Sequence, residues 1–223
     1  EALVPVWLYE SGTGAPVAFV DVWLPAGASQ TIDLAGPFFA DMPDGFLGTA
    51  RAFGSPVAVM STVDMATSQM GVAALEGIPV DAAADTLYAP LIHAARPLPM
   101  DTIVSPRRTT TIVLANPGSS PVAFTATYRG ADGSCEGRTY RQDGTIAGNA
   151  NLVLAPGGAS PGGLPDDCVA SAVIHSTGGE LLGVVIETTT NGLVLAGAYD
   201  LASAADGART VIVPATSSRA PAY

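Results

Sequence analysis

Short apolar runs alternate with glycine- and proline-containing turns along most of this chain. In residues 122–129 every second position is apolar and the positions between them are mainly polar, as expected of a strand with one buried face. Val-, Ile- and Thr-rich runs of this kind recur, separated by turn signals such as NPG, APGG and GG; they are residues 109–115, 121–128, 151–155, 169–177, 180–190, 193–202 and 210–215. About seven strands in about 100 residues predict an all-β fold, built as antiparallel β-sandwiches of the immunoglobulin-like (Ig-like) type.

The chain also carries an internal repeat. The tetrapeptide PVAF occurs at 16–19 and again at 121–124, which is 121 − 16 = 105 positions later. Further segments match in the same order: 6–12 with 112–118, 24–29 with 154–160, 42–50 with 164–172, and 86–93 with 210–217. Several matches in one order are much harder to obtain by chance than any single match. We therefore predict two tandem β-sandwich domains, residues 1–96 and 97–223.

The second copy is longer than the first. The Pro-Asp pair recurs 165 − 43 = 122 positions later, so the second copy holds 122 − 105 = 17 extra residues, which fall in the polar, Gly-rich stretch 129–151. We expect this stretch to be a long loop insertion. It contains Cys135, and Cys168 follows it; these are the two cysteines of the chain. We predict that they form a disulfide that ties the insertion to a strand, in preference to two free buried thiols, in an oxidising compartment outside the cytoplasm.

The strand at 16–24 differs from its counterpart in the second copy. Val17, Phe19 and Trp23 share one face with Asp21, while the opposite face is also apolar. Both faces therefore need a cover. An overlying loop or the other domain is one candidate cover, and a second subunit is the other. Asp21 on the face expected to be buried has no partner in the pattern, although an unpaired buried carboxylate is costly.

The segments TLYAPLIH (86–93) and TVIVPATS (210–217) follow the two copies, and neither has a counterpart ahead of the first copy. If each closes the domain before it, both domains are complete. If each begins the domain after it, the first domain lacks a strand and the second is followed by a spare one, which is the pattern expected for strand donation between molecules. Pro90 and Pro214 argue for a sheet edge or a bulge at these places, since proline donates no ladder hydrogen bond.

The strand-donation hypothesis assigns residues to both sides of a subunit interface. The donated strand lies within 209–218 and contains Thr210, Val211, Ile212, Val213, Pro214 and Ala215. The acceptor surface contains Val6, Trp7, Leu8, Tyr9, Val20 and Val22.

Composition and charge exclude several classes of partner. The net charge is −11 and the pI is about 4.3, so the surface repels nucleic acid, and no apolar run approaches the roughly 18 residues of a membrane span. All nine basic residues are arginine, which excludes lysine chemistry such as Schiff bases and isopeptide crosslinks.

Candidate chemistry in the sequence is weak. His93 and His175 are the two histidines, too few for the usual His-rich zinc sites, and no GxSxG motif indicates a serine hydrolase. The acidic residues flanking or following Pro43 and Pro165 are candidate calcium ligands or glycosidase carboxylates, but Asp at such junctions more often caps a turn; they are Asp41, Asp44, Asp166 and Asp167. We predict no enzyme activity, no metal and no cofactor.

The NPGSSPVAFTATY hairpin and the LAPGGAS turn, present in related form in both copies, resemble the tandem Ig-like β-sandwich repeats of secreted and surface-attached bacterial proteins. The resemblance implies an extracellular structural or adhesive role. We expect a structural subunit of a pilus-like surface filament that pairs with itself head to tail. The alternative is an adhesive or carbohydrate-binding module of a larger surface protein, with glycans or other cell-surface proteins as partners and Trp7, Tyr9 and Trp23 as an aromatic platform.

Overall fold

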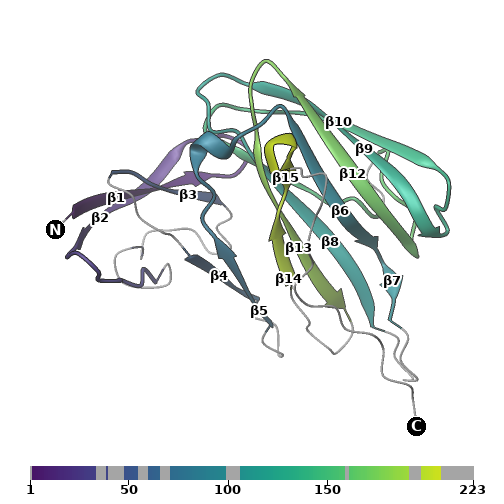
Figure 1. Ribbon diagram of the computed structural model, residues 1–223, viewed down its shortest axis with the longest axis horizontal. Helices are drawn as coiled ribbons and strands as arrows, with labels where there is room; N and C mark the ends of the chain where they lie inside the picture. Colours follow the sequence, from purple (N-terminus) through teal and green to yellow (C-terminus); the bar gives the residue numbers. More distant parts are fainter. Residues whose placement is uncertain are drawn as a thin grey trace, which may run out of the picture.

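The computed structural model describes residues 2–33, 39, 48–54, 60–65, 71–98, 106–158, 161–190 and 197–206 (Figure 1). Its strands are β1 (Ala2–Glu10), β2 (Pro16–Leu24), β3 (Gly48–Ala52), β4 (Met60–Met65), β5 (Gly71–Glu76), β6 (Thr86–Ala94), β7 (Arg96–Pro97), β8 (Arg107–Ala115), β9 (Val122–Gly133), β10 (Thr139–Ile146), β11 (Asn151–Leu154), β12 (Cys168–Thr177), β13 (Leu182–Thr190), β14 (Gly197–Asp200) and β15 (Ala202–Ser203). Single-turn 3-10 helices lie at Val80–Ala82, between β5 and β6, and at Ala204–Asp206, directly after β15. All pairs of these strands are antiparallel, so the all-β prediction is confirmed.

The strands from β6 onward form two sheets, which lie on the right of Figure 1. One sheet has the order β10-β9-β12-β6-β15, and the other has the order β11-β8-β13-β14, with β7 added beside β8. Strands β8 and β9 are consecutive in the chain but belong to different sheets. The chain therefore crosses from one sheet to the other at the NPG turn, as in a sandwich. We call this part, residues 86–206, the second unit.

Apolar side chains from both sheets of the second unit form one core. Phe124 and Tyr128 on β9 are 3% and 0% exposed, as their alternation in the sequence predicts. Ile112 and Leu114 on β8 meet them from the opposite sheet and are fully buried. The Tyr128 hydroxyl donates a hydrogen bond of 2.6 Å to Gln142 Oε1, and burial raises the pKa of this tyrosine. This buried phenol is thus hydrogen-bonded as burial requires.

The insertion at 129–151 is not the loop that its composition suggested. Its residues extend β9 to Gly133, make a turn, and return as β10, which pairs with β9 from Thr139↔Arg129 to Ile146↔Val122. The sequence of β10 does not alternate cleanly between apolar and polar residues, because one of the positions that face the core is polar. That position is Gln142, which accepts the buried hydroxyl of Tyr128.

The first repeat folds differently in its described residues. Strands β2, β1 and β3 form one three-stranded sheet, in which Val4 pairs with Val22 and Trp7 with Phe19, and β4 and β5 form a separate hairpin. Thus β1 and β2 lie side by side in one sheet, whereas their repeat counterparts β8 and β9 lie in opposite sheets. The two repeats share a sequence pattern but not this strand pairing, and the described strands of the first repeat do not enclose a core of their own.

Side-chain hydrogen bonds and a close backbone contact join the first repeat to the second unit. Arg51 on β3 donates to the carbonyl oxygen of Asn116 at 2.8 Å and to Asn149 Oδ1 at 2.8 Å. Asn151 Nδ2 donates to Thr49 Oγ1 at 2.7 Å. The β1–β2 turn packs against the backbone of residues 148–150 at Gly14, whose φ is +68°.

Replacing Gly14 tests this junction. Gly14→Ala places a Cβ on the backbone oxygen of Gly148, in addition to the strain of a positive φ. Gly27→Ala is the matched control, because Gly27 has φ +75° and a Cβ added there would meet no atom within 4 Å. We expect Gly27→Ala to lower the free energy of unfolding by about 1 kcal/mol and Gly14→Ala by about 2–3 kcal/mol. Thermal unfolding followed by circular dichroism measures both, and equal losses would contradict the close packing at Gly14.

Candidate functional site

Strand β6 completes a sheet of the unit that follows it in the chain. It pairs with β12 from Thr86↔His175 to Ala94↔Cys168, and its other edge pairs only briefly with β15. Leu87 is 2% exposed and Ile92 is fully buried in the core of the second unit. The predicted boundary between residues 96 and 97 would leave this strand in the first domain. Its hydrogen bonds and its buried side chains are in the second unit instead, so we assign it there.

Polar contacts also tie β6 to the opposite sheet. The backbone N–H of His93 donates to Thr110 Oγ1 at 2.9 Å, and His93 Nδ1 lies 2.5 Å from Glu187 Oε1. The Tyr199 hydroxyl donates to the carbonyl oxygen of Leu91 at 2.5 Å. Burial raises the pKa of Tyr199 to about 12, so this hydroxyl stays protonated at neutral pH. β6 therefore connects both layers of the second unit.

The proline of β6 lies at a bulge. The pairing of β6 with β12 shifts register between Ala170 and Ala172, and the two β6 residues at the shift are Pro90 and Leu91. A bulge leaves one residue out of the hydrogen-bond ladder, so the missing N–H of proline costs nothing there. Pro214 holds the matching position in the segment 210–217, which is outside the described residues.

Within the described residues, the first repeat has no strand in the place of β6. The counterpart of β12 is β3, because the match of 42–50 with 164–172 aligns Gly48 with Ala170. Strand β3 pairs with β1 and forms one edge of the three-stranded sheet. Its other edge therefore has no strand partner among the described residues.

The predicted acceptor residues lie on β1 and β2. They are Val6, Trp7, Leu8 and Tyr9 on β1, and Val20 and Val22 on β2. β1 is the central strand, and its residues 6–9 pair with β2 on one side and with β3 on the other. A further strand could pair with β1 only by displacing one of these neighbours. β2, which carries Val20 and Val22, and β3 each have an outer edge without a strand partner among the described residues. The sequence-based prediction did not consider the edge of β3, although the repeat match that identifies β3 as the counterpart of β12 is visible in the sequence.

The first repeat exposes side chains whose counterparts are buried. Phe19 and Trp23 occupy the positions of Phe124 and Tyr128 and are 60% and 61% exposed, compared with 3% and 0%. Asp21 lies on the same exposed face, which removes the expected problem of an unpaired buried carboxylate. One face of the three-stranded sheet is thus apolar, aromatic and open to solvent.

This face includes a shallow, mainly apolar hollow. It is lined by Pro5, Trp7, Tyr9, Pro16 and Phe53. Trp7 stacks on Phe19 with ring centroids 5.2 Å apart, and the guanidinium of Arg51 lies 5.1 Å from the centroid of the Tyr9 ring. These contacts hold the aromatic rings in place across three neighbouring strands.

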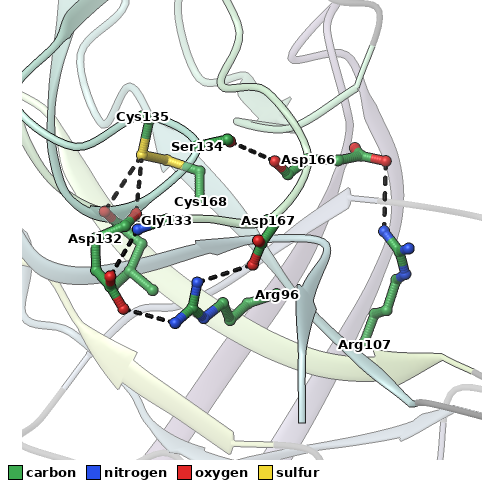
Figure 2. Close-up of polar contacts among 10 residues, drawn as sticks. Arg96, Arg107, Asp132, Gly133, Ser134, Cys135, Asp166, Asp167 and Cys168 are labelled. Carbon is green, nitrogen blue, oxygen red and sulfur yellow. Dashed lines mark hydrogen bonds and ion pairs between the residues drawn. A yellow bond between two sulfur atoms is a disulfide. The ribbon is translucent and has the colours of Figure 1, made fainter.

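The predicted disulfide is confirmed. Cys135 and Cys168 are bonded, with Cα atoms 5.4 Å apart, and both are fully buried (Figure 2). The bond joins the turn after β9 to the first residue of β12. It therefore connects two neighbouring strands of the sheet that contains β6.

Figure 2 also shows the ion pairs of Asp166 and Asp167, two of the acidic residues considered in the sequence, and of the neighbouring Asp132. Arg96 lies 2.6 Å from Asp132 and 2.8 Å from Asp167, and Arg107 lies 3.6 Å from Asp166. These acidic residues pair with arginines around a turn, and partly exposed pairs of this kind contribute about 0–1 kcal/mol each. Asp41 and Asp44 lie outside the described residues. In the part of the chain that is described, no three His, Cys, Asp or Glu residues group as metal ligands.

The two histidines differ in setting. His175 on β12 is exposed, and its Nδ1 lies 3.2 Å from Thr86 Oγ1. His93 is buried between the sheets in the contacts with Thr110 and Glu187. His175 therefore contacts β6 within its own sheet, whereas His93 connects β6 to the opposite sheet.

No protein-family model and no curated protein matches this chain. Among solved structures, the crystal structure of Thermotoga maritima 1070 is similar over 54% of this chain and 94% of that chain, with 11% sequence identity and a TM-score of 0.42. Over the described residues, no helix has the length and hydropathy to cross a membrane.

Removing the disulfide tests how firmly it holds the second unit. Its two cysteines are 33 residues apart, and closing a loop of this length stabilises the folded state by about 3–4 kcal/mol in the chain-entropy account. We expect Cys135→Ser with Cys168→Ser to lower the free energy of unfolding by about this amount, measured by urea denaturation. A change below about 1 kcal/mol would show that the ladder of β9, β10 and β12 suffices without the crosslink.

Proposed function

We propose that this protein is a structural subunit of an extracellular filament, assembled head to tail by donation of a β-strand. The donated strand is residues 209–218, and it enters the first repeat of the next copy. The single observation that carries the proposal is the position of β6. β6 and residues 210–217 are two copies of one repeated segment, and β6 belongs to the unit that follows it in the chain, not to the one before it.

That position favours one of the two arrangements that the sequence left open. β6 pairs with β12 of the unit that follows it, and residues 210–217 repeat the β6 segment. In the first repeat, the outer edge of β3 has no strand partner among the described residues. A strand of the β6 type and an unpaired sheet edge are complementary, and joining them between copies makes a heterologous contact that propagates into a filament.

The exposed apolar face supports the same proposal. Phe19 and Trp23 are core residues by their place in the repeat, yet they are mostly exposed in the single chain. Fully burying one large apolar side chain stabilises a fold by about 1.5–3 kcal/mol. Contact between copies that covers this face therefore adds a driving force for assembly to that of strand pairing.

The disulfide supports the extracellular part of the proposal. Cys135 and Cys168 are bonded, and stable structural disulfides form in oxidising compartments such as the cell surface. The alternative role as a carbohydrate-binding module is less well supported. A sugar would stack on an open aromatic face, but the Trp7 ring is already stacked on Phe19.

Deleting residues 209–223 tests the proposed function. We expect the full chain to form high-molecular-weight assemblies and the truncated chain to remain a soluble monomer, because the truncated chain keeps its acceptor but has no strand to donate. Size-exclusion chromatography with light scattering measures both. The second unit should keep its melting temperature, since its own completing strand, β6, is intact. A monomeric full chain, or a truncated chain that still assembles, would contradict donation.

A pair of point variants gives a matched control for the deletion. On β6, Leu87 is 2% exposed and Tyr88 is 40% exposed, and their counterparts are Val211 and Ile212. Val211→Asp puts a carboxylate on the buried side of the donated strand and should block assembly. Ile212→Asp puts it on the outer side and should leave assembly largely intact.

A further inference from the structure

We propose that the donated strand binds at the outer edge of β3, in a defined register, and not at β1 or β2. This inference rests on the proposed function and specifies its binding site. It follows from comparing the hydrogen-bond directions of β3 with those of β12, the strand that receives β6.

The direction of the β12 hydrogen bonds is fixed by one backbone contact. The N–H of Ser176 donates to the carbonyl oxygen of Asp85 at 2.7 Å. In an antiparallel ladder, hydrogen-bonded residues alternate along the strand. Ile174 and Ala172 therefore also direct their N–H and C=O groups toward β6, opposite Leu87 and Ala89, while the residues between them face β9.

The hydrogen-bond directions of β3 follow in the same way. The N–H of Phe53 donates to the carbonyl oxygen of Pro5 at 2.9 Å, so Phe53 and Arg51 direct their backbone groups toward β1. Ala52 and Ala50 consequently direct theirs toward the outer edge. Since 174 − 122 = 52 and 172 − 122 = 50, these two residues are the counterparts of the β12 residues that bind β6. The edge that the repeat assigns to the donated strand is the free edge of the described sheet.

The repeat also gives the register. The donor segment is offset from β6 by 210 − 86 = 124 positions, and β3 is offset from β12 by 122. Transferring the β6–β12 pairs gives Thr210 opposite Phe53, Val211 opposite Ala52, Ile212 opposite Arg51, and Val213 opposite Ala50. Pro214 then falls at the bulge, as Pro90 does in β6.

Side-chain faces agree with this register. Ala50 pairs with Leu8, which is 2% exposed, so Ala50 and Ala52 lie on the same face of the sheet as this buried leucine, although Ala50 itself is exposed. Paired residues in adjacent strands project to the same face. Val211 and Val213 therefore continue the apolar face of β1 and β3 by one more strand.

Cysteine pairs test the register in assembled protein. Thr210 and Phe53 form a pair that is not hydrogen-bonded, in which Cβ atoms of opposed residues approach most closely. We expect the double variant Thr210→Cys, Phe53→Cys to give a ladder of disulfide-linked multimers after mild oxidation, read on a non-reducing gel. The native disulfide is fully buried and does not compete.

Two control variants separate this register from its neighbours. Thr210→Cys with Ala52→Cys places the thiols on opposite faces, and Ile212→Cys with Phe53→Cys shifts them by one two-residue step. We expect at least about ten-fold less linked multimer from each. Assemblies that form but link equally in all three variants, or only in a control, would overturn the β3 register while leaving strand donation in place. Absence of assemblies in the unmodified protein would instead overturn the proposed function.

Hydrogen exchange covers the case in which the cysteine variants assemble poorly. The amides of Ala50 and Ala52 point to the outer edge of β3, which has no strand partner among the described residues, and the donated strand should cover them in assemblies of the unmodified protein but not in the monomer lacking residues 209–223. We expect their exchange to slow at least about a hundred-fold on assembly. Unchanged exchange at these two amides in assembled protein would overturn the site.

Discussion

The backbone hydrogen bonds between β6 and β12 are the interaction on which this arrangement depends. β6 supplies part of the core with Leu87 and Ile92 and is held to the opposite sheet through His93. A sheet that lacks such a strand exposes a row of N–H and C=O groups together with apolar side chains. The second unit avoids this because the chain supplies the strand just before it. In the first repeat, β3 has an edge without a strand partner among the described residues.

The first repeat pairs its strands differently from the second unit. In the second unit the counterparts of β1 and β2 lie in opposite sheets, so their apolar faces point toward each other across a core. In the first repeat these strands pair within one sheet, and that sheet can bury only one of its faces. Leu8 and Val22 lie on the buried face, and Phe19 and Trp23 remain on the exposed one. The exposed aromatic face is thus explained by pairing geometry, without a ligand.

Much of the fold could be predicted from local pattern, and the rest depended on pairing between distant strands. The alternation around Phe124 predicted a buried strand correctly, and Cys135 and Cys168 predicted their disulfide. The strand β10 was missed because Gln142 interrupts its apolar face, and only the Tyr128 hydroxyl across the core explains that residue. The acceptor was placed on β1 and β2 because their side chains are apolar. Apolarity does not show which strand has a free edge; β1 is paired on both sides, and of the two edge strands the repeat match with β12 favours β3 over β2.

The most direct test of the account is electron cryomicroscopy of the purified assemblies, at a resolution that traces the chain. The account predicts that residues 209–218 leave their own subunit and run antiparallel to β3 of the next one, with Val211 and Val213 on the face of that sheet that carries Leu8. A reconstruction in which these residues fold back on their own chain, with subunits joined by other surfaces, would contradict it.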